Sequence, residues 1–399
     1  MADNNENKVL NVPHLRFPEF SGEWEMASLQ DIAAINPKSD QLQNTFIYID
    51  LEAVEKGELR KIQEIMREEA PSRAQRVINN NDILFQCVRP YQKNNYIHKI
   101  LNTSNQQWVA STGYAQIRTT ESPNYIYHLL NTDGFNRKVM VRCTGSSYPA
   151  INSEDLATIR FYYTPDKKEQ FKISRLLDLI DERIATQNKI IEKLQSLIKG
   201  LVDELMTVLL KGKLYPFSSF YIKAGEGGTP TTSVVEYYTE GTIPFIKIED
   251  LSCKYLTNNK DFITELGMQK SSAWLIPSKS VIYSNGATIG AISINEYPVC
   301  TKQGILGIVP NTNINVEYLY LLMSSSYFSK EISRIITEGT MKTAYLKDIN
   351  HIKCPLPSMA QQKNITNLTS SIEEKLSIEQ ELLRFLNLQK QYLLHMIFI

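Results

Sequence analysis

The stretch KISRLLDLIDERIATQNKIIEKLQSLIKGLVDEL, residues 172–205, carries apolar residues at steps of alternately four and three positions. This spacing is typical of a helix that buries one stripe of side chains against a second helix. A single helix with such a stripe can equally pack on the core of its own domain. The seam positions are Ile173, Leu177, Ile180, Ile184, Ile191, Leu194, Ile198 and Leu201, with the polar Gln187 among them.

A second helix with the same seam is predicted 192 positions further on, counted from Ile173 to Ile365. Because each helix can bury its stripe against the other, the two are expected to pair as an antiparallel coiled coil with pseudo-twofold symmetry. The seam positions of the second helix are Ile365, Ile372, Leu376, Leu383, Leu386 and Leu393.

The segments that precede the two helices also repeat each other. FIYIDLEAV from Phe46 resembles PFIKIEDLS from Pro244, and NNNDILFQCVRP from Asn79 resembles PSKSVIYSNGAT from Pro277, which predicts a strand, a turn and a strand in each half. Further matches follow in the same order at nearly constant offsets. A repeat of this length indicates two duplicated domains and not a solenoid of short repeats.

The sequence therefore predicts an α+β protein with two tandem similar domains, each followed by a long helix. The expected division is an N-terminal arm (1–20), a first domain (21–165), a first helical spacer (166–212), a second domain (213–357) and a second helical spacer (358–399).

Composition sets only broad limits on function. Lysine plus arginine and aspartate plus glutamate number 43 each, so no global positive field advertises a nucleic-acid partner, although a local basic face would suffice to bind one. The 5 cysteines are scattered, which predicts a reducing cytoplasm and neither disulfides nor a metal site. No secretory signal or membrane-spanning run is expected from the sequence.

The sequence lacks the loops that are typical of methyltransferase and ATPase active sites. An adenine-N6 methyltransferase should have an Asn- or Asp-Pro-Pro-aromatic loop, but Asn36-Pro37 is followed by Lys38-Ser39. No GxxxxGK[ST] motif of an ATPase is present. The glycine-rich stretch 225–230 lacks the GxGxxG spacing of a phosphate cradle and is interpreted as a turn entering a strand. We expect catalysis to reside in another chain.

Several runs resemble one known family. GGTPTTSVVEYYTEGTIPFIKIEDL from Gly227, VIYSNGATIGAISI from Val281, TKQGILGI from Thr301 and EGTMKTAYLKDINHIKCPLPSMAQQ from Glu338 resemble a target-recognition domain of type I restriction-modification specificity subunits. The first half, from LRFPEFSGEWE to TGSSYPAINSEDL, resembles a divergent copy. One departure is Cys354-Pro-Leu-Pro where the family usually has Ile-Pro-Leu-Pro. Essentially the whole chain is covered.

This resemblance implies a non-catalytic DNA-binding subunit. Each domain would read one half of a bipartite double-stranded DNA site, and the coiled coil would fix the unread gap. The helices would dock two methyltransferase subunits, and motor-nuclease subunits would complete the restriction complex. S-adenosylmethionine, ATP and Mg would then be cofactors of the partner subunits and not of this chain.

Base reading requires hydrogen-bond donors and acceptors on loops, chiefly Arg, Lys, Asn, Gln, Ser and Thr. The glycines beside such residues can equally serve tight turns, and the hydroxyl groups can cap them. The candidates in the first domain are Arg89, Tyr91, Gln92, Lys93, Asn94, Ser111, Thr112, Arg142, Ser146, Ser147 and Tyr148. Those in the second are Thr229, Thr231, Thr232, Ser284, Asn285, Thr288, Lys302, Gln303, Thr340, Lys342 and Thr343.

Two other functions compete with this interpretation. A coiled-coil adaptor with two duplicated domains could bind protein instead of DNA, and salt-dependent binding of duplex DNA would distinguish the two. A self-contained modification enzyme is disfavoured by the missing methyltransferase loop.

Overall fold

The computed structural model describes residues 11–99, 106–286, 288–336 and 342–399 of an α+β chain. Its residues form two compact units, one made of 1–188 with 381–399 and the other of 189–380. Each unit therefore combines one strand-rich domain with a segment of both long helices. The expected α+β fold with two tandem domains, each followed by a long helix, is confirmed. The pseudo-twofold symmetry between the units stays a prediction.

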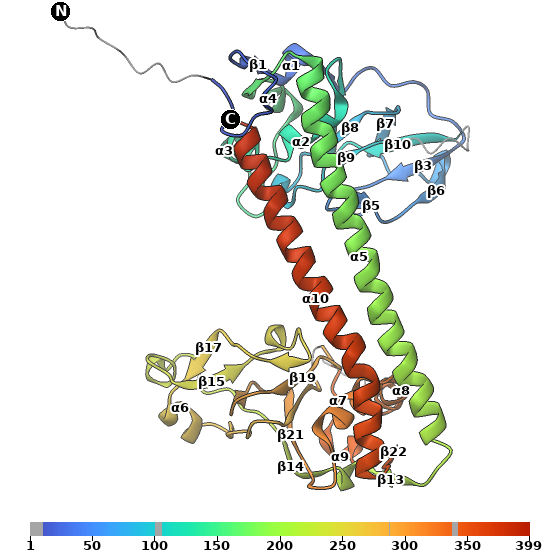
Figure 1. Ribbon diagram of the computed structural model, residues 1–399, viewed down its shortest axis with the longest axis vertical. Coiled ribbons are helices and arrows are strands. Elements are labelled where there is room, and N and C mark those ends of the chain that lie inside the picture. The colour runs from blue at the N-terminus through green and yellow to red at the C-terminus, as the bar shows by residue number, and fades with distance from the viewer. Residues whose placement is uncertain (1–10, 100–105, 287, 337–341) are drawn as a thin grey trace, which may run out of the picture. The chain divides into compact units, whose positions relative to one another are not determined.

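Among the described residues, the first domain contains four sheets and four short α-helices, which precede helix α5 (Lys167–Leu209) (Figure 1). The sheet orders are β2-β11-β8-β9, β6-β3-β10-β7, β1-β12 and β4-β5. The strands are β1 (Glu25–Ser28), β2 (Ala33–Ile35), β3 (Thr45–Ile49), β4 (Val54–Glu55), β5 (Glu58–Leu59), β6 (Gln63–Met66), β7 (Ala74–Ile78), β8 (Ile83–Gln86), β9 (Tyr96–Ile97), β10 (Gln107–Ser111), β11 (Tyr114–Thr119) and β12 (Arg160–Tyr163). The helices are α1 (Leu29–Ile32), α2 (Pro123–Leu130), α3 (Asp133–Arg142) and α4 (Ser153–Ala157).

The second domain repeats this plan before helix α10 (Met359–Ile397). Its sheet orders are β14-β21-β18-β19-β16, β17-β15-β20 and β13-β22. The strands are β13 (Leu214–Pro216), β14 (Tyr221–Glu226), β15 (Ile243–Ile246), β16 (Tyr255–Leu256), β17 (Asp261–Ile263), β18 (Val281–Ser284), β19 (Ile292–Asn295), β20 (Cys300–Thr301), β21 (Ile305–Pro310) and β22 (Lys353–Pro355). The helices are α6 (Glu265–Gln269), α7 (Val316–Ser324), α8 (Ser326–Ile335) and α9 (Leu346–Ile349).

The duplication extends to individual backbone hydrogen bonds. The Cys87 N–H donates to Gly113 at 3.0 Å, and the Asn285 N–H donates to Gly304 at 3.0 Å. The carbonyl of Cys87 accepts from Ile151 at 3.0 Å, as that of Asn285 accepts from Ala344 at 2.9 Å. Three loops therefore converge at the same topological position in both domains.

The named seam residues of α5 and α10 are all buried or half-buried in both units. In unit 1 the ion pair between Lys390 and Asp181 (2.5 Å) joins the helices, and Leu394 shares a core with Leu177. The two segments run antiparallel there, because higher numbers in α10 match lower numbers in α5. The buried seam residues are Ile173, Leu177, Ile180, Ile191, Ile365 and Leu386. The half-buried ones are Ile184, Leu194, Ile198, Leu201, Ile372, Leu376, Leu383 and Leu393.

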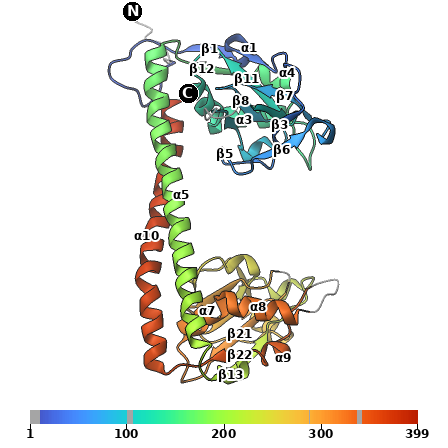
Figure 2. The same cartoon turned by 90° about the vertical axis from the view of Figure 1, so that its right-hand side faces the viewer.

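Each helix also has a second apolar face that the heptad pattern did not predict. Val202 and Met206 of α5 are buried in the core of the second domain. The C-terminal part of α5 runs alongside that domain (Figure 2). Leu394 of α10 is buried in the core of the first domain, beside Ile397, which continues the predicted seam four positions after Leu393. The helix ends are therefore structural parts of the domains as well as parts of a helix pair.

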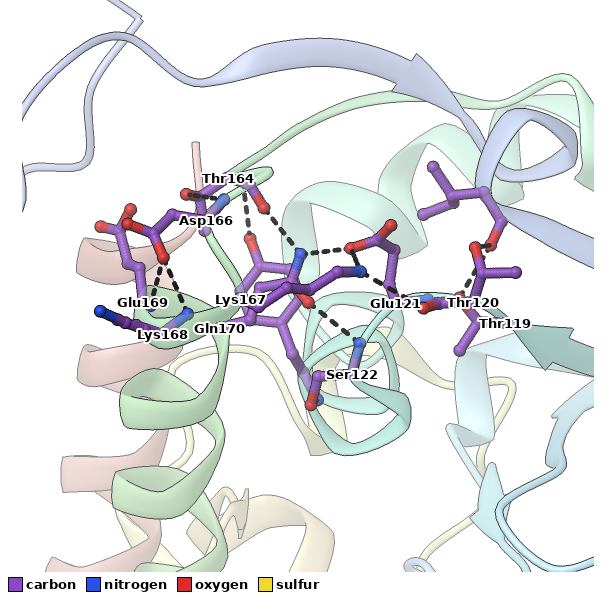
Figure 3. A network of polar contacts seen from close by, with 12 residues as sticks. Thr119, Thr120, Glu121, Ser122, Thr164, Asp166, Lys167, Lys168, Glu169 and Gln170 are labelled. Carbon is purple, nitrogen blue, oxygen red and sulfur yellow. Dashed lines mark hydrogen bonds and ion pairs between the residues drawn. The ribbon is translucent and has the colours of Figure 1, made fainter.

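A buried glutamine in the first turn fixes each long helix to its domain. Gln170 accepts from the Ser122 N–H at 2.9 Å and donates to the Thr164 carbonyl at 2.8 Å (Figure 3). Gln362 accepts from the Asn315 N–H at 2.7 Å and donates to the Pro357 carbonyl at 2.9 Å. Both glutamines are 0% exposed. Their bonds join the start of the helix to the N-cap of α2 or α7.

We expect the substitutions Gln170→Leu and Gln362→Leu to destabilise their units. Each leaves a buried N–H and a buried carbonyl without a partner, and such groups cost about 1–3 kcal/mol each. The matched control is Gln195→Leu on an exposed turn of α5. Urea unfolding followed by circular dichroism measures the midpoints. Equal shifts for Gln195→Leu and for the two variants of the buried glutamines would contradict the prediction.

Candidate nucleic-acid interface

The first candidate loop follows β8 and contains the run RPYQKNN. Within this run, Arg89 and Lys93 both adopt positive φ angles, 55° and 53°, which are uncommon for residues other than glycine. Between them lies a short 3-10 helix, Pro90–Gln92. Lys93 Nζ pairs with Asp133 at 2.5 Å, and this hydrogen bond lowers the pKa of the Asp133 carboxyl. The charge of Lys93 is thus engaged within the domain, while Tyr91 is exposed.

The second candidate loop, 144–150, lies against the first. Thr144 and Ala150 exchange two backbone hydrogen bonds of 2.9 Å, so the loop is a tight hairpin. Gly145 has a φ of 89°, and a Cβ at this position would lie 3.0 Å from the Tyr148 carbonyl oxygen. Glycine is therefore needed for this turn, and the turn places the Tyr148 ring 4.4 Å from the Arg89 guanidinium.

Two candidates of the first domain form hydrogen bonds within the domain. Ser111 is 3% exposed, and its Oγ accepts from the Gly113 N–H at 3.2 Å. Arg142 Nη1 donates to the Asp155 carbonyl at 2.8 Å and to Thr158 Oγ1 at 2.7 Å. The selection of Ser111 as a DNA contact is corrected accordingly, because sequence did not show that Ser111 ends a buried strand. Arg142 is exposed, and its role as a DNA contact stays a prediction.

In the second domain the candidate loops also converge. The Gln303 N–H donates to Thr229 Oγ1 at 3.4 Å, and the neighbouring Gly304 N–H donates to Glu226 Oε1 at 2.6 Å. Gly286 lies so close to Gly304 that a Cβ on it would be 3.2 Å from the Gly304 Cα. Close backbone approach explains these glycines without any bound phosphate.

The glycine-rich stretch ends a strand, whereas sequence predicted a turn that enters one. β14 includes Gly225 and ends at Glu226, and an irregular segment follows. A Cβ on Gly227 would lie 2.1 Å from the Thr301 carbonyl oxygen, and one on Gly228 would lie 2.2 Å from Ser272 Oγ. Two chain segments therefore pass directly over these glycines, so any larger residue would clash at either position.

Ser284 and Asn285 are buried, at 0% and 1% exposure, so their selection as DNA contacts is corrected. Asn285 Nδ2 donates to the Ala344 carbonyl at 3.1 Å. Thr340 lies outside the described residues. The exposed candidates are Tyr91, Gln92, Arg142, Ser146, Ser147, Tyr148, Thr231, Thr232, Thr288, Lys302, Gln303 and Lys342. The half-buried candidates are Arg89, Lys93, Asn94, Thr112, Thr229 and Thr343.

Sequence reasoning missed three residues beside these loops. Glu226 supports the loop of Gly304, as described above. Arg76 and Trp274 occupy equivalent places, each two residues before an isoleucine that pairs with the strand leading into a candidate loop. Burial lowers the pKa of Arg76, and the side-chain N–H groups Arg76 Nε and Trp274 Nε1 find no partner among the described residues. No local signal in the sequence indicates this equivalence, because Arg76 lies in β7 whereas Trp274 lies in an irregular segment before the bridge at Ile276.

A cavity of about 770 Å³ in unit 1 lies between α3 and the segments of α5 and α10. It is lined by charged residues that are largely paired, including Lys93 with Asp133 and Lys390 with Asp181. Within the described part of the chain, no group of three or more His, Cys, Asp or Glu could hold a metal ion. No helix among the described residues is long and apolar enough to cross a membrane.

A family profile described as the type I restriction modification DNA specificity domain matches residues 21–196 and again 220–387. The chain belongs to this family. Each matched range contains most of one copy of the fold together with part of the long helix that follows it. The alternative of a protein-binding adaptor is not supported.

Curated relatives are similar over different parts of the chain. The MjaIX specificity subunit of Methanocaldococcus jannaschii is 30% identical over 37% of this chain and 35% of its own length. The EcoR124I/EcoR124II specificity subunit of Escherichia coli is 30% identical over 42% and 43%. These matches span less than half of either relative. The HindI specificity subunit of Haemophilus influenzae is 22% identical over 80% of this chain and 83% of its own.

Solved structures share the fold. The S subunit of a type I restriction-modification system from M. genitalium is 15% identical, with a TM-score of 0.56 over 97% of this chain and 99% of that one. A chain from a study of complex assembly and conformational transition of the type I R-M system is 19% identical, with a TM-score of 0.56 over 93% and 96%.

Proposed function

We propose that this chain is the non-catalytic specificity subunit of a type I restriction-modification complex, in which each domain reads one half of a bipartite double-stranded DNA site. The observation that carries the proposal is the recurrence of the same three converging loops in two domains of one chain. Two copies of a loop cluster with different side chains suit two different half-sites, because sequence is read by side-chain donors and acceptors.

The partner subunits would supply the chemistry. Two methyltransferase subunits would transfer a methyl group from S-adenosylmethionine to one adenine in each half-site, and motor-nuclease subunits would use ATP and Mg to translocate and cleave DNA. A separate reader suits this division of labour, because the adenine must leave the base stack to be methylated while the surrounding sequence is held in register.

An exposed apolar face of α10 is the proposed docking site for one methyltransferase subunit. Phe385, Leu388 and Tyr392 are 51%, 50% and 58% exposed, and their spacing of three and four positions places them on one side of the helix. Aromatic side chains that are exposed together in this way are typical of the centre of a protein interface.

The experiment is to purify the chain alone and together with its methyltransferase subunits, and to measure methylation and duplex binding. We expect the chain alone to methylate and cleave nothing with S-adenosylmethionine, ATP and Mg. The complex is expected to methylate one bipartite motif and to bind it in a salt-dependent manner. Turnover that copurifies with this chain in the absence of any other subunit would contradict the proposal, as would binding without sequence preference by the complex.

The same preparation tests the docking face. The triple substitution Phe385→Ser, Leu388→Ser and Tyr392→Ser should weaken methyltransferase binding and methylation together. A matched control is Gln380→Ser with Gln389→Ser, since both glutamines are exposed polar residues of the same helix. Unchanged affinity of the triple variant would place the docking site elsewhere.

A further inference from the structure

The guanidinium of Arg89 forms no hydrogen bond or ion pair with any residue that the structure describes. It lies 4.4 Å from the centroid of the Tyr148 ring. Tyr148 itself is 63% exposed. Arg142, the other arginine that sequence named in this domain, is occupied by two hydrogen bonds to its own domain.

The loop around Arg89 is held by its backbone. The Arg89 N–H donates to the Pro149 carbonyl at 2.8 Å, and the Arg89 carbonyl accepts from the Gln92 N–H at 3.0 Å. Asn136 Nδ2 donates to the Pro90 carbonyl at 3.1 Å. Arg89 also has a φ of 55°, where glycine would be the less strained residue. The side chain is thus dispensable for the turn and costly at this backbone position, which points to a ligand.

We propose that Arg89, oriented by Tyr148, reads a guanine in the major groove of the half-site bound by the first domain. This inference rests on the proposed function and deepens it, since it names the base that one domain selects. An arginine offers a planar fork of donors that matches the O6 and N7 acceptors of guanine, and this is the commonest specific contact between a side chain and a base.

The stacking on Tyr148 favours base reading over a phosphate contact. A phosphate accepts from a charge in many orientations, so a freely moving lysine or arginine serves as well. An arginine laid against an aromatic ring is restricted before it binds, and its donor edge keeps one direction. The nearby cation Lys93 is paired with Asp133 and would not compete for the same base.

The second domain has no equivalent side chain. The matched hydrogen bonds align Cys87 with Asn285, so the position of Arg89 corresponds in sequence to Ala287. Alanine has no polar group to offer a base. The guanine contact is therefore assigned to one half-site, the half that persists when residues 213–357 are exchanged.

The test is a binding competition with the complex of this chain and its methyltransferase subunits. The affinity for the methylated motif is compared with that for duplexes in which each G·C pair of the first half-site is replaced by A·T. We expect Arg89→Gln to reduce the discrimination at one G·C pair on the order of ten- to a hundredfold, leaving other positions unchanged. Arg89→Lys should retain part of it, and Tyr148→Leu should lose less than Arg89→Gln.

The control is Arg60→Gln, which removes the same charge from an arginine that pairs with Glu58 at 2.9 Å. Thermal unfolding verifies that each variant is folded. If Arg89→Gln weakened all duplexes equally and preserved discrimination, Arg89 would be a phosphate contact and the inference would be wrong. A first half-site made entirely of A·T pairs would overturn it too. A wild-type complex without any sequence preference would instead defeat the proposed function.

Discussion

A chain in which residues 213–357 are replaced by the equivalent region of a relative is expected to methylate a motif with one half changed and the other half intact. The reason is structural separation. Every candidate loop of the second domain lies in unit 2, and every candidate loop of the first lies in unit 1. Both ends of the replaced region fall outside the long helices, after Leu209 and before Met359.

The exchange requires that the new domain packs on the retained helices. Val202, Met206 and Ile365 belong to the core of the second domain but lie outside the replaced region. A relative that has residues of similar size at these three positions is the appropriate donor, because volume-conserving changes are tolerated best. Sequencing of methylated adenines gives the motif. A folded, active chimera with both halves changed would show that the domains do not read independently.

The second expected result is a longer gap between two unchanged half-sites after a one-turn insertion in α5. Four residues placed between Lys199 and Gly200 lengthen the helix by roughly 6 Å, which corresponds to about one or two base pairs at roughly 3.4 Å each. The position is suitable because Gly200 is exposed, and a Cβ on it would contact nothing within 4 Å. α5 continues without interruption across the boundary between the units at Asn188.

The insertion has a matched control, the same four residues in the exposed loop after Leu256. That variant should leave the gap unchanged. The helical insertion adds slightly more than one turn, so the register of Val202 and Met206 shifts and some loss of stability is expected alongside the longer gap. A folded and active insertion variant whose gap equals that of the parent would show that α5 does not set the spacing.

The sequence was sufficient for the features that depend on periodicity. The seam of α5 was predicted because apolar residues recur at heptad spacing over many turns, and the duplication was predicted because several short patterns recur in order. The second apolar face of the helices was not predicted, since Val202 and Met206 are apolar residues outside the seam that a heptad count ignores. Whether such residues face solvent or a core depends on the tertiary partner.

The candidate site was predictable at the level of loops and not of side chains. The polar loops after β8 and β18 do converge with their neighbours, as the matched hydrogen bonds of Cys87 and Asn285 show. Within these loops some candidate side chains are exposed and others are buried, and the sequence did not distinguish the two groups. Ser111 and Asn285 are polar residues at strand ends, and nothing local distinguishes an inward from an outward side chain there. The partners of Arg142 likewise depend on a fold-specific approach of α3 to α4.

The division of each helix between two units has a consequence for synthesis on the ribosome. The core of unit 1 needs Leu394 and Phe398, whose aromatic ring lies 6.1 Å from Trp24, whereas unit 2 uses residues no later than Gln380. Translation from residue 165 to residue 381 takes roughly 10–40 s at about 5–20 residues per second. During that interval the Trp24 ring lacks its contact with Phe398. The domain that is translated first is therefore the one that is completed last.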